Sequence, residues 1–202
     1  MKIGINPKDD VRRYRAVAEA VGDRAVIQVD GNPGYSMDEA LWALSEMEAI
    51  GGLGAIEQPV ADRADLAELA RRLSTPIMAD EAIYAPEDAI SVVRERAASL
   101  ALMKITKHGG IQHVREIGSI FGAAHLRLSI AIYFDLIAVS AAHLAAAIPC
   151  ATWPSPFTYL NDTILATPFE PSGTRLDATD EPGWGISLDP DKVARYATST
   201  MS

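Results

Sequence analysis

Short apolar runs alternate with segments of helical periodicity along most of this 202-residue chain. Runs this continuously apolar predict strands that are buried on both faces, as in a parallel sheet. We expect six such strands, at residues 25–29, 53–56, 77–79, 100–103, 126–132 and 150–153. The helices expected around them lie at about residues 9–21, 37–50, 64–73, 86–96, 110–121 and 136–148. This order predicts an α/β protein, either a (β/α) barrel or a doubly wound open sheet.

Residues that favour helix ends support this order of elements. Ser36 precedes one expected helix and Glu39 follows three residues later, which is a capping box, and Pro86 suits a first helical turn. Gly22 and the glycine pair at residues 51–52 lie where helices should end in a residue that tolerates positive φ. No G-x-G-x-x-G motif follows the first strand, which disfavours a dinucleotide-binding open sheet.

The composition of the chain changes near residue 158, where Pro, Gly, Asp and Thr become frequent. We therefore divide the chain into a barrel portion at residues 1–157 and an irregular C-terminal extension at residues 158–202. An extended piece at residues 174–178 and a short helix near residues 191–196 are expected within this extension. It is expected to pack on the barrel or on a separate capping domain.

Charge and hydropathy exclude several classes of function. A formal net charge of −9 argues against a nucleic-acid partner, because phosphate binding needs clustered Lys and Arg. The mean hydropathy of +0.07 predicts a soluble protein, and no apolar run approaches the ~20 residues of a membrane span. One cysteine, Cys150, excludes an internal disulfide and fits a reducing compartment. With no signal peptide before the charged N-terminal segment, we expect a cytoplasmic protein.

Charged residues lie at the carboxyl ends of four expected strands. Asp30, Glu57 and the pair Asp80 and Glu81 end the first three, and Lys104 ends the fourth. In a parallel barrel the active site is built on this face, so three carboxylates would lie side by side. Unpaired carboxylates at this distance repel and raise one another's pKa, and a divalent cation removes the conflict. All-oxygen ligation favours Mg²⁺ or Mn²⁺ over zinc.

Each of these motifs, taken alone, has a simpler explanation. The Asp-Gly-Asn sequence at residues 30–32 is also typical of a turn. Glu-Gln-Pro at residues 57–59 also fits an exposed strand end, and the pair at 80–81 also fits a helix start. Their repetition at one topological position on three successive strands favours the metal site.

The series of motifs resembles the muconate lactonizing subgroup of the enolase superfamily, within the mandelate racemase/muconate lactonizing enzyme family. The resemblance covers nearly the whole chain, including Glu-Pro-Gly-Trp-Gly-Ile at residues 181–186. It is carried by Lys-x-Gly at 2–4, Asp-x-Asn at 30–32, Glu-x-Pro at 57–59, Asp-Glu at 80–81 and Lys-x-x-Lys-x-Gly-Gly at 104–110. It implies an enolase-type (β/α)7β TIM-like barrel that is incomplete, because it starts at the end of the second barrel strand.

The resemblance also implies roles for individual residues. Asp30, Glu57 and Asp80 would bind Mg²⁺ or Mn²⁺, and Lys104 would be one acid/base lysine. Lys2 matches the second lysine of a Lys-x-Lys pair, so it would face the substrate from the opposite side, although a disordered terminal lysine is the alternative. Five further residues are expected to support the metal or contact the substrate: Asn32, Glu81, Lys107, Tyr133 and Asp135.

Two positions depart from the family's pattern. Tyr133 lies where the subgroup often carries a glutamate after the seventh strand, which puts the polarity of the substrate in doubt. His143 lies in an Ala-rich helix and is expected to be a core or interface histidine, so no His-Asp dyad of the mandelate racemase kind is predicted.

The function implied is a metal-dependent isomerase or lyase that removes the proton next to a substrate carboxylate through an enediolate intermediate. An epimerase, a cycloisomerase or a dehydratase would all fit, each with a small carboxylate-bearing substrate. The alternative is a catalytically inactive metal-binding or subunit-interaction domain. A phosphate-binding βα barrel is disfavoured, because no glycine-rich phosphate loop occurs late in the chain.

Family members begin with a capping domain and a first barrel strand, and neither precedes Met1 in this sequence. We therefore expect residues 1–202 alone to have little activity. A barrel that lacks its first strand and most of its second has two unpaired sheet edges, which favour self-association. A homo-oligomer is the expected assembly.

Overall fold

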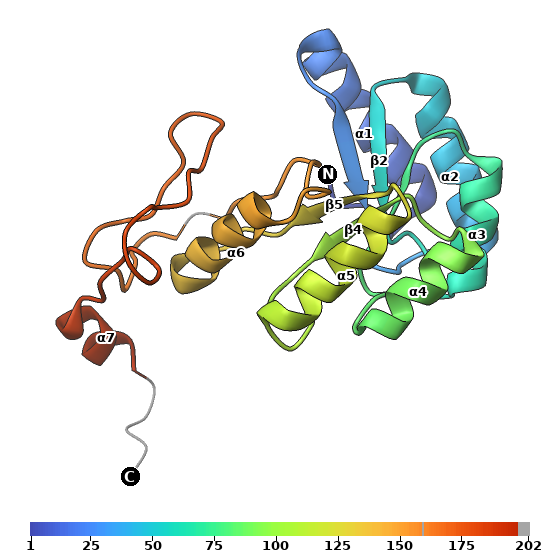
Figure 1. Ribbon diagram of the computed structural model, residues 1–202. Coiled ribbons are helices and arrows are strands. Elements are labelled where there is room, and N and C mark those ends of the chain that lie inside the picture. Colours follow the sequence, from blue (N-terminus) through green and yellow to red (C-terminus); the bar gives the residue numbers. More distant parts are fainter. Residues whose placement is uncertain (159, 198–202) are drawn as a thin grey trace.

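The computed structural model describes residues 1–158 and 160–197. In this part of the chain, five parallel strands pair in the order β1-β2-β3-β4-β5 and the sheet curls into half of a barrel (Figure 1). The strands are β1 (Ile27–Asp30), β2 (Leu53–Glu57), β3 (Ile77–Ala79), β4 (Leu100–Met103) and β5 (Arg127–Ile130). The helices are α1 (Pro7–Val21), α2 (Met37–Ile50), α3 (Arg63–Arg72), α4 (Pro86–Glu95), α5 (Ile111–Ala123), α6 (Asp135–Ala147) and α7 (Pro190–Tyr196), with a 3-10 turn η1 (Gly22–Arg24).

The structure confirms the α/β class, the incomplete barrel and five of the six expected strands. The prediction of a strand at residues 150–153 is wrong. That segment runs beside β5 without a continuous ladder. The Leu128 N–H donates to the Cys150 carbonyl over 2.8 Å, and the Trp153 N–H donates to the Leu128 carbonyl over 3.0 Å. These two partners of Leu128 are three residues apart, where a regular parallel ladder requires two, because the Thr152 N–H turns back to the Cys150 carbonyl over 2.9 Å.

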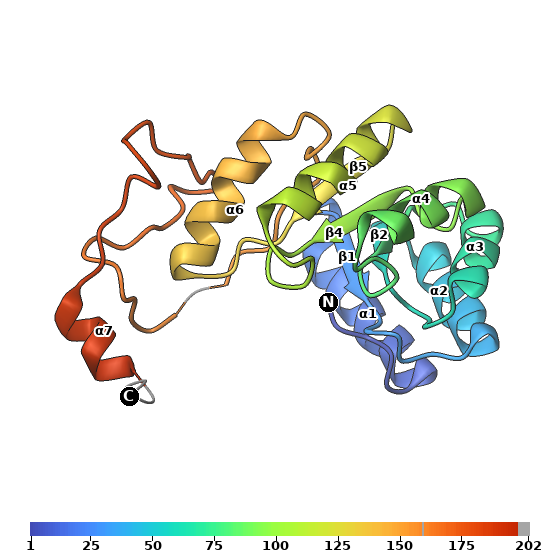
Figure 2. The ribbon, with the colours of Figure 1, turned by 60° about the horizontal axis from the view of Figure 1, so that its bottom comes forward.

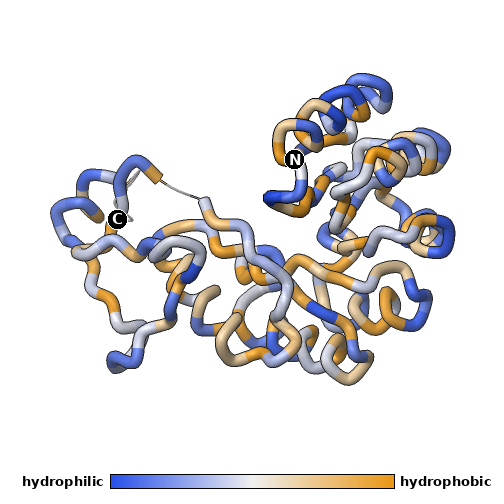
Figure 3. Tube along the Cα trace, turned by 90° about the horizontal axis from the view of Figure 1, so that it is seen from above, coloured by the Kyte–Doolittle hydropathy of each residue, from blue (hydrophilic) through white to orange (hydrophobic). Residues whose placement is uncertain are grey.

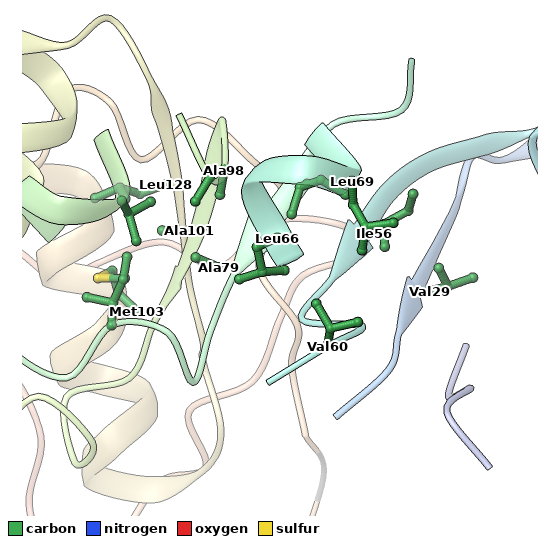
Figure 4. Close-up of a cluster of buried hydrophobic side chains, with 14 of the residues drawn as sticks. Val29, Ile56, Val60, Leu66, Leu69, Ala79, Ala98, Ala101, Met103 and Leu128 are labelled. Atoms are coloured by element: carbon green, nitrogen blue, oxygen red, sulfur yellow. The ribbon is translucent and has the colours of Figure 1, made fainter. Parts of the chain in front are cut away.

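Each strand divides its side chains between two apolar layers, as its period of two requires. On β4, Ala101 and Met103 join the layer beneath the helices, whereas Leu100 and Leu102 join a smaller layer inside the curl. Figure 4 shows the first layer, where side chains from successive strands lie beside Leu66 and Leu69 of α3. Burial on both faces explains why the strands read as continuous apolar runs.

Residues 1–3 extend the sheet beyond β1. The Ile3 N–H donates to the Asp30 carbonyl over 2.8 Å, and the Asp30 N–H donates to the Met1 carbonyl over 2.9 Å. Lys2 therefore bridges Asp30 in parallel register, at the same edge of the sheet as the other strand ends.

Glycines bring the loops at this edge into backbone contact. A Cβ on Gly4 would overlap the Gly31 carbonyl, and a Cβ on Gly31 would lie 2.5 Å from the Cα of Pro59. The loops that follow Lys2, β1 and β2 consequently pack against one another closely enough to gather their side chains at one place.

The local signals read from the sequence operate as expected. The Ser36 N–H donates to the Glu39 carboxylate over 3.0 Å, and Pro86 opens α4. Gly22 has a φ of 55°, and Gly51 ends α2 with a φ of 95°. These residues fix where the helices begin and end, and thereby where the neighbouring strands can start and stop.

The C-terminal residues project away from the βα body, past α6 and towards α7 (Figures 1 and 2). They are largely hydrophilic in Figure 3 and contain short bridges, at Leu165–Leu188 and Ser172–Arg175, instead of the extended piece expected at 174–178. The expected helix near 191–196 is present as α7. Residues 159 and 198–202, which the predicted extension includes, lie outside the described residues. No helix of the described residues is both long and apolar enough to cross a membrane.

Candidate active site at the carboxyl edge of the sheet

The sheet register brings the three expected metal ligands to one edge. Asp30, the last residue of β1, pairs directly with Glu57, the last residue of β2. Glu57 in turn pairs with Met78 of β3, and Asp80 follows two residues later. Asp80 is fully buried and Glu57 is 5% exposed, so both carboxylates lie in a medium where charge is costly.

A cavity of about 540 Å³ opens at this edge, and both predicted acid/base lysines line it. Acidic, polar and apolar residues form the rest of its wall. The lining residues are Met1, Lys2, Gln28, Asp30, Glu57, Leu102, Lys104, Tyr133, Pro154, Ser155 and Pro156. A larger cavity, of about 800 Å³, is lined by residues of α5 and the start of β5. It lies at the opposite end of β5 and contains none of the predicted site residues.

Lys2 closes the site at the β1 edge. Its ammonium group pairs with the Asp30 carboxylate and donates to Asn32 Oδ1 over 2.6 Å. Asn32 has a φ of 42°, and its N–H donates to Asp30 Oδ1 over 3.0 Å, which turns its amide back towards Lys2. The side chain of Lys2 is 68% exposed, so these contacts hold it in place without burying it.

Asp80 pairs with two lysines on the other side of the site. Lys104 contacts Oδ2, and Lys107 contacts Oδ1 over 2.6 Å. Burial raises the pKa of Asp80, but the two ammonium groups outweigh burial and hold it below its ordinary value. Burial lowers the pKa of Lys104, and the ion pair with Asp80 outweighs this and raises it. Burial dominates at Lys107 and lowers its pKa despite Asp80.

The pKa of the Glu57 carboxyl group, unlike that of Asp80, lies above its ordinary value. Burial raises its pKa to about 7, and the charges of Asp30 and Asp80 add to the rise. A hydrogen bond of 2.8 Å from Gln28 Nε2 to Glu57 Oε2 acts in the opposite direction. A carboxyl group in this position favours either a proton or a nearby cation.

The remaining predicted residues are not all at the cavity. Tyr133 lines it, and Glu81 follows Asp80 with a buried Oε2 that has no partner among the described contacts. Asp135, by contrast, accepts hydrogen bonds from the hydroxyl of Thr163 and the N–H of Ile164, so its side chain faces the C-terminal extension.

Among the described contacts, neither His143 nor His108 has a hydrogen bond or ion pair with the three carboxylates. His143 is half-buried and its ring lies 5.5 Å from that of Trp184, in an edge-on contact. His108 is buried and its Nδ1 lies 2.7 Å from the Lys104 carbonyl. Burial lowers the pKa of His108 to about 4, so it is neutral and braces the backbone that carries Lys104.

Sequence reasoning assigned no role to Gln58, although the motif that contains it was singled out. Gln58 is fully buried with a φ of 32°, and its Oε1 accepts from the Asp80 N–H over 2.9 Å and from the Ala82 N–H over 3.0 Å. Its Nε2 donates to the Val60 carbonyl over 2.9 Å. Gln58 therefore fixes the loop that presents Asp80. A polar residue directly after a strand-end carboxylate was the only available signal.

The donor set suits a hard divalent cation, although the carboxylates do not yet converge on one point. Among the described residues, no group of three His, Cys, Asp or Glu side chains is close enough together to hold a metal ion. Asp30 and Asp80 instead pair with lysine ammonium groups. The pKa of the buried Glu57 is raised chiefly by burial, and a cation bound by carboxylate oxygens would stabilise its charged form.

The fold and this edge define a parallel βα half-barrel with acidic side chains and lysines at the carboxyl ends of its strands. The chain belongs to the enolase C-terminal domain-like family, whose pattern it matches over residues 1–192.

Relatives within this superfamily are enzymes. Muconate cycloisomerase 1-1 of Acinetobacter lwoffii is 32% identical over 97% of this chain and 53% of its own length. The o-succinylbenzoate synthase of Mycobacterium tuberculosis is 42% identical over 55% of this chain and 33% of its own. The structure of the muconate lactonizing enzyme from Pseudomonas putida superposes with a TM-score of 0.87 at 29% identity, covering 96% of this chain and 56% of that one. The chain thus spans about half the length of the muconate enzymes it matches.

The raised pKa of Glu57 predicts a pH-dependent stability of the metal-free protein. Because the folded state binds this proton more tightly than the unfolded state does, stability is greatest below pH 4.5 for this group and falls as the pH rises to about 7. We expect the free energy of unfolding to drop by roughly 2–3 kcal/mol through this group. Urea unfolding in chelator across this range measures it.

The comparison with Glu57→Gln isolates the group, because glutamine has no proton to lose. This variant should lack the decline, whereas Glu46→Gln, at an exposed position of α2, should follow the wild type. Parallel curves for wild type and Glu57→Gln would show that Glu57 titrates normally.

Proposed function

We propose that this chain carries the metal and acid/base residues of an isomerase or lyase that removes the proton next to a substrate carboxylate. Asp30, Glu57 and Asp80 would hold Mg²⁺ or Mn²⁺. The observation that supports this best is the register that brings these carboxylates to one edge, with Glu57 buried beside the charges of Asp30 and Asp80. The bound cation would stabilise negative charge on the substrate carboxylate.

Lys104 and Lys2 are the proposed proton carriers. They line one cavity from positions after β4 and beside β1, respectively. A lysine must be neutral to accept a proton, and here the ion pair with Asp80 keeps Lys104 charged. Neutralising Asp80 would leave burial as the dominant influence on Lys104 and would lower its pKa. The same carboxylate thus links the proposed metal site to the proposed base.

The proposed substrate is a small carboxylate-bearing molecule, and the proposed assembly is a homo-oligomer. Tyr133, Leu102 and two prolines contribute apolar surface to the cavity that the charged groups also line. The relatives' names direct the screen towards cycloisomerase and o-succinylbenzoate synthase reactions. Epimerisation of dipeptides, other amino-acid derivatives and proline derivatives completes it.

Magnesium binding tests the proposed metal site directly. Calorimetric titration of the 202-residue chain with magnesium chloride should give one site, and Asp80→Asn should weaken binding more than ~100-fold. That loss exceeds the ~10–100-fold typical of residues that only support a ligand. Asp38→Asn, an exposed aspartate of α2, is the matched control and should bind like the wild type.

Circular dichroism and thermal unfolding establish that each variant is folded. Equal binding by wild type and a folded Asp80→Asn variant would exclude Asp80 as a ligand. Magnesium binding with no turnover of any screened substrate, in the longest natural form of the protein, would favour a catalytically inactive metal-binding domain.

A further inference from the structure

A chain of hydrogen bonds crosses the interior of the half-barrel and ends on Glu57. The indole Nε1–H of Trp153 donates to Gln28 Oε1 over 3.0 Å. Gln28 Nε2 donates in turn to Glu57 Oε2 over 2.8 Å. Neither Gln28 nor Trp153 belongs to the motifs of the strand ends, and the reaction proposed above assigns neither of them a role.

This chain of hydrogen bonds joins the first and last strands of the described sheet. Gln28 lies on β1 and Trp153 is attached by its backbone N–H to Leu128 of β5, and β1 and β5 are the first and last strands in the order of the described sheet. Backbone pairing does not connect these two strands, so the side chains span the gap between them. The position of Glu57 therefore depends on a segment more than ninety residues away in the sequence.

Local structure directs both side chains inward. The register of β1 on β2 shifts between Ile27 and Gln28, a bulge of the kind that re-aims a side chain. Trp153 packs on the inner apolar layer, and the guanidinium group of Arg127 lies 4.9 Å from its ring centre. Both groups are half-buried, where a hydrogen bond is less weakened by water than at the surface.

The chemistry of the three groups allows only one orientation. An indole N–H can donate but cannot accept, so it selects the oxygen of the Gln28 amide. The NH₂ group of the same amide is then turned towards Glu57, and it can donate to a carboxylate. If the amide were reversed, its oxygen would face the Glu57 carboxylate and would repel it.

We propose that Gln28 and Trp153 are positioning residues, which hold Glu57 Oε2 so that Oε1 is presented to the metal ion. This inference rests on the proposed function, because it assigns the two residues a role at the same metal site. Trp153 acts through Gln28 and makes no contact with the metal or the substrate in this role.

The hydrogen-bonded chain is tested first without metal. In ¹⁵N-labelled protein three indole N–H resonances are expected, from Trp42, Trp153 and Trp184. The resonance that disappears in Trp153→Phe belongs to Trp153. It should be shifted downfield and slow to exchange with solvent, and Gln28→Leu should move it upfield and accelerate its exchange. An unchanged resonance in folded Gln28→Leu would show that this chain of hydrogen bonds does not form.

The positioning role is tested with magnesium chloride by calorimetry on the same proteins. Gln28→Leu should weaken binding by ~10–100-fold, the range for residues that orient a metal ligand. Trp153→Phe, which keeps the ring but removes the donor, should weaken it in the same direction. The double variant should be no weaker than Gln28→Leu, because Trp153 acts only through Gln28. Trp42→Phe, on the outer side of α2, should bind like the wild type.

The outcomes separate this inference from the proposed function. Normal magnesium affinity in Gln28→Leu, or additive losses in the double variant, would overturn the positioning role while the metal site stands. No magnesium binding by the wild type would overturn the metal site and the positioning role together, and the indole resonances would still decide whether the chain of hydrogen bonds exists.

Discussion

Replacing Asp10 with alanine is expected to lower the free energy of unfolding by roughly 3–5 kcal/mol, because it removes a buried carboxylate that accepts several hydrogen bonds. Asp10 is 1% exposed at the start of α1. Its Oδ2 accepts from the Tyr35 hydroxyl over 2.6 Å and from the N–H groups of residues 4–6 over 3.0–3.2 Å, and its Oδ1 pairs with Arg13. Alanine would leave these donors without an acceptor.

This network matters for the site because it holds the segment that carries Lys2. Arg13 donates to the Lys2 carbonyl over 3.1 Å, while Asp10 binds the loop that follows. Burial raises the pKa of Asp10, but the hydrogen bonds from Tyr35 and Arg13 outweigh it and lower the pKa below its ordinary value. The stabilisation should therefore be present above pH 4 and be lost as the pH falls below it.

Asp9→Ala is the matched control, because Asp9 lies in the same first turn and pairs only with the exposed Arg12 among the described contacts. It loses the same interaction with the helix dipole and should cost ~1 kcal/mol or less. Urea unfolding of both variants measures the difference. Equal stabilities would show that the buried network contributes nothing beyond an acidic residue at a helix start.

Replacing Lys104 with alanine is expected to slow turnover by ~10²–10⁴-fold, the usual contribution of a general acid or base. Solvent-deuterium exchange of the substrate's α-proton should be lost on one face only, because Lys2 would serve the other. Proton NMR in D₂O, on the longest natural form of the protein and a substrate found by the screen, follows both faces separately.

Lys104→Arg distinguishes catalysis from structural support. Arginine keeps a positive charge beside Asp80, but it cannot be deprotonated in a protein. It should restore the stability lost in Lys104→Ala without restoring exchange. Lys8→Ala, at an exposed position of α1, should have no effect on either. Exchange on both faces in Lys104→Ala, or normal activity in Lys104→Arg, would refute the assignment.

Much of this fold is determined by local properties of the sequence. Runs such as 100–103 are apolar at every position because both faces of the strand are buried, so their strand character can be read directly. Ser36, Pro86 and Gly51 act within a single turn of helix, and each operates as its residue type predicts. The carboxylates of Asp30, Glu57 and Asp80 could be placed at one edge because parallel strands end on the same side.

Tertiary structure alone decided how these groups interact. The segment 150–153 is apolar enough for a strand, but a turn from Cys150 to Thr152 makes its pairing with β5 irregular. Asp135 was expected near the substrate, yet its side chain faces Thr163. The opposite pKa directions of Glu57 and Asp80 follow from which one has lysines within contact distance, and this depends on residues brought together from β3 and β4.

The sequence by itself thus determined the class of fold, the order of its elements and the residues at the carboxyl edge, because these depend on neighbours within one strand or one helical turn. Only the tertiary structure decided the ion pairs of Asp80, the role of Gln58 and the chain from Trp153 through Gln28 to Glu57. Such contacts join segments that are distant in the sequence. They cannot be read from the sequence, because the burial, charge and separation of these groups are set only when the sheet curls and brings the segments together.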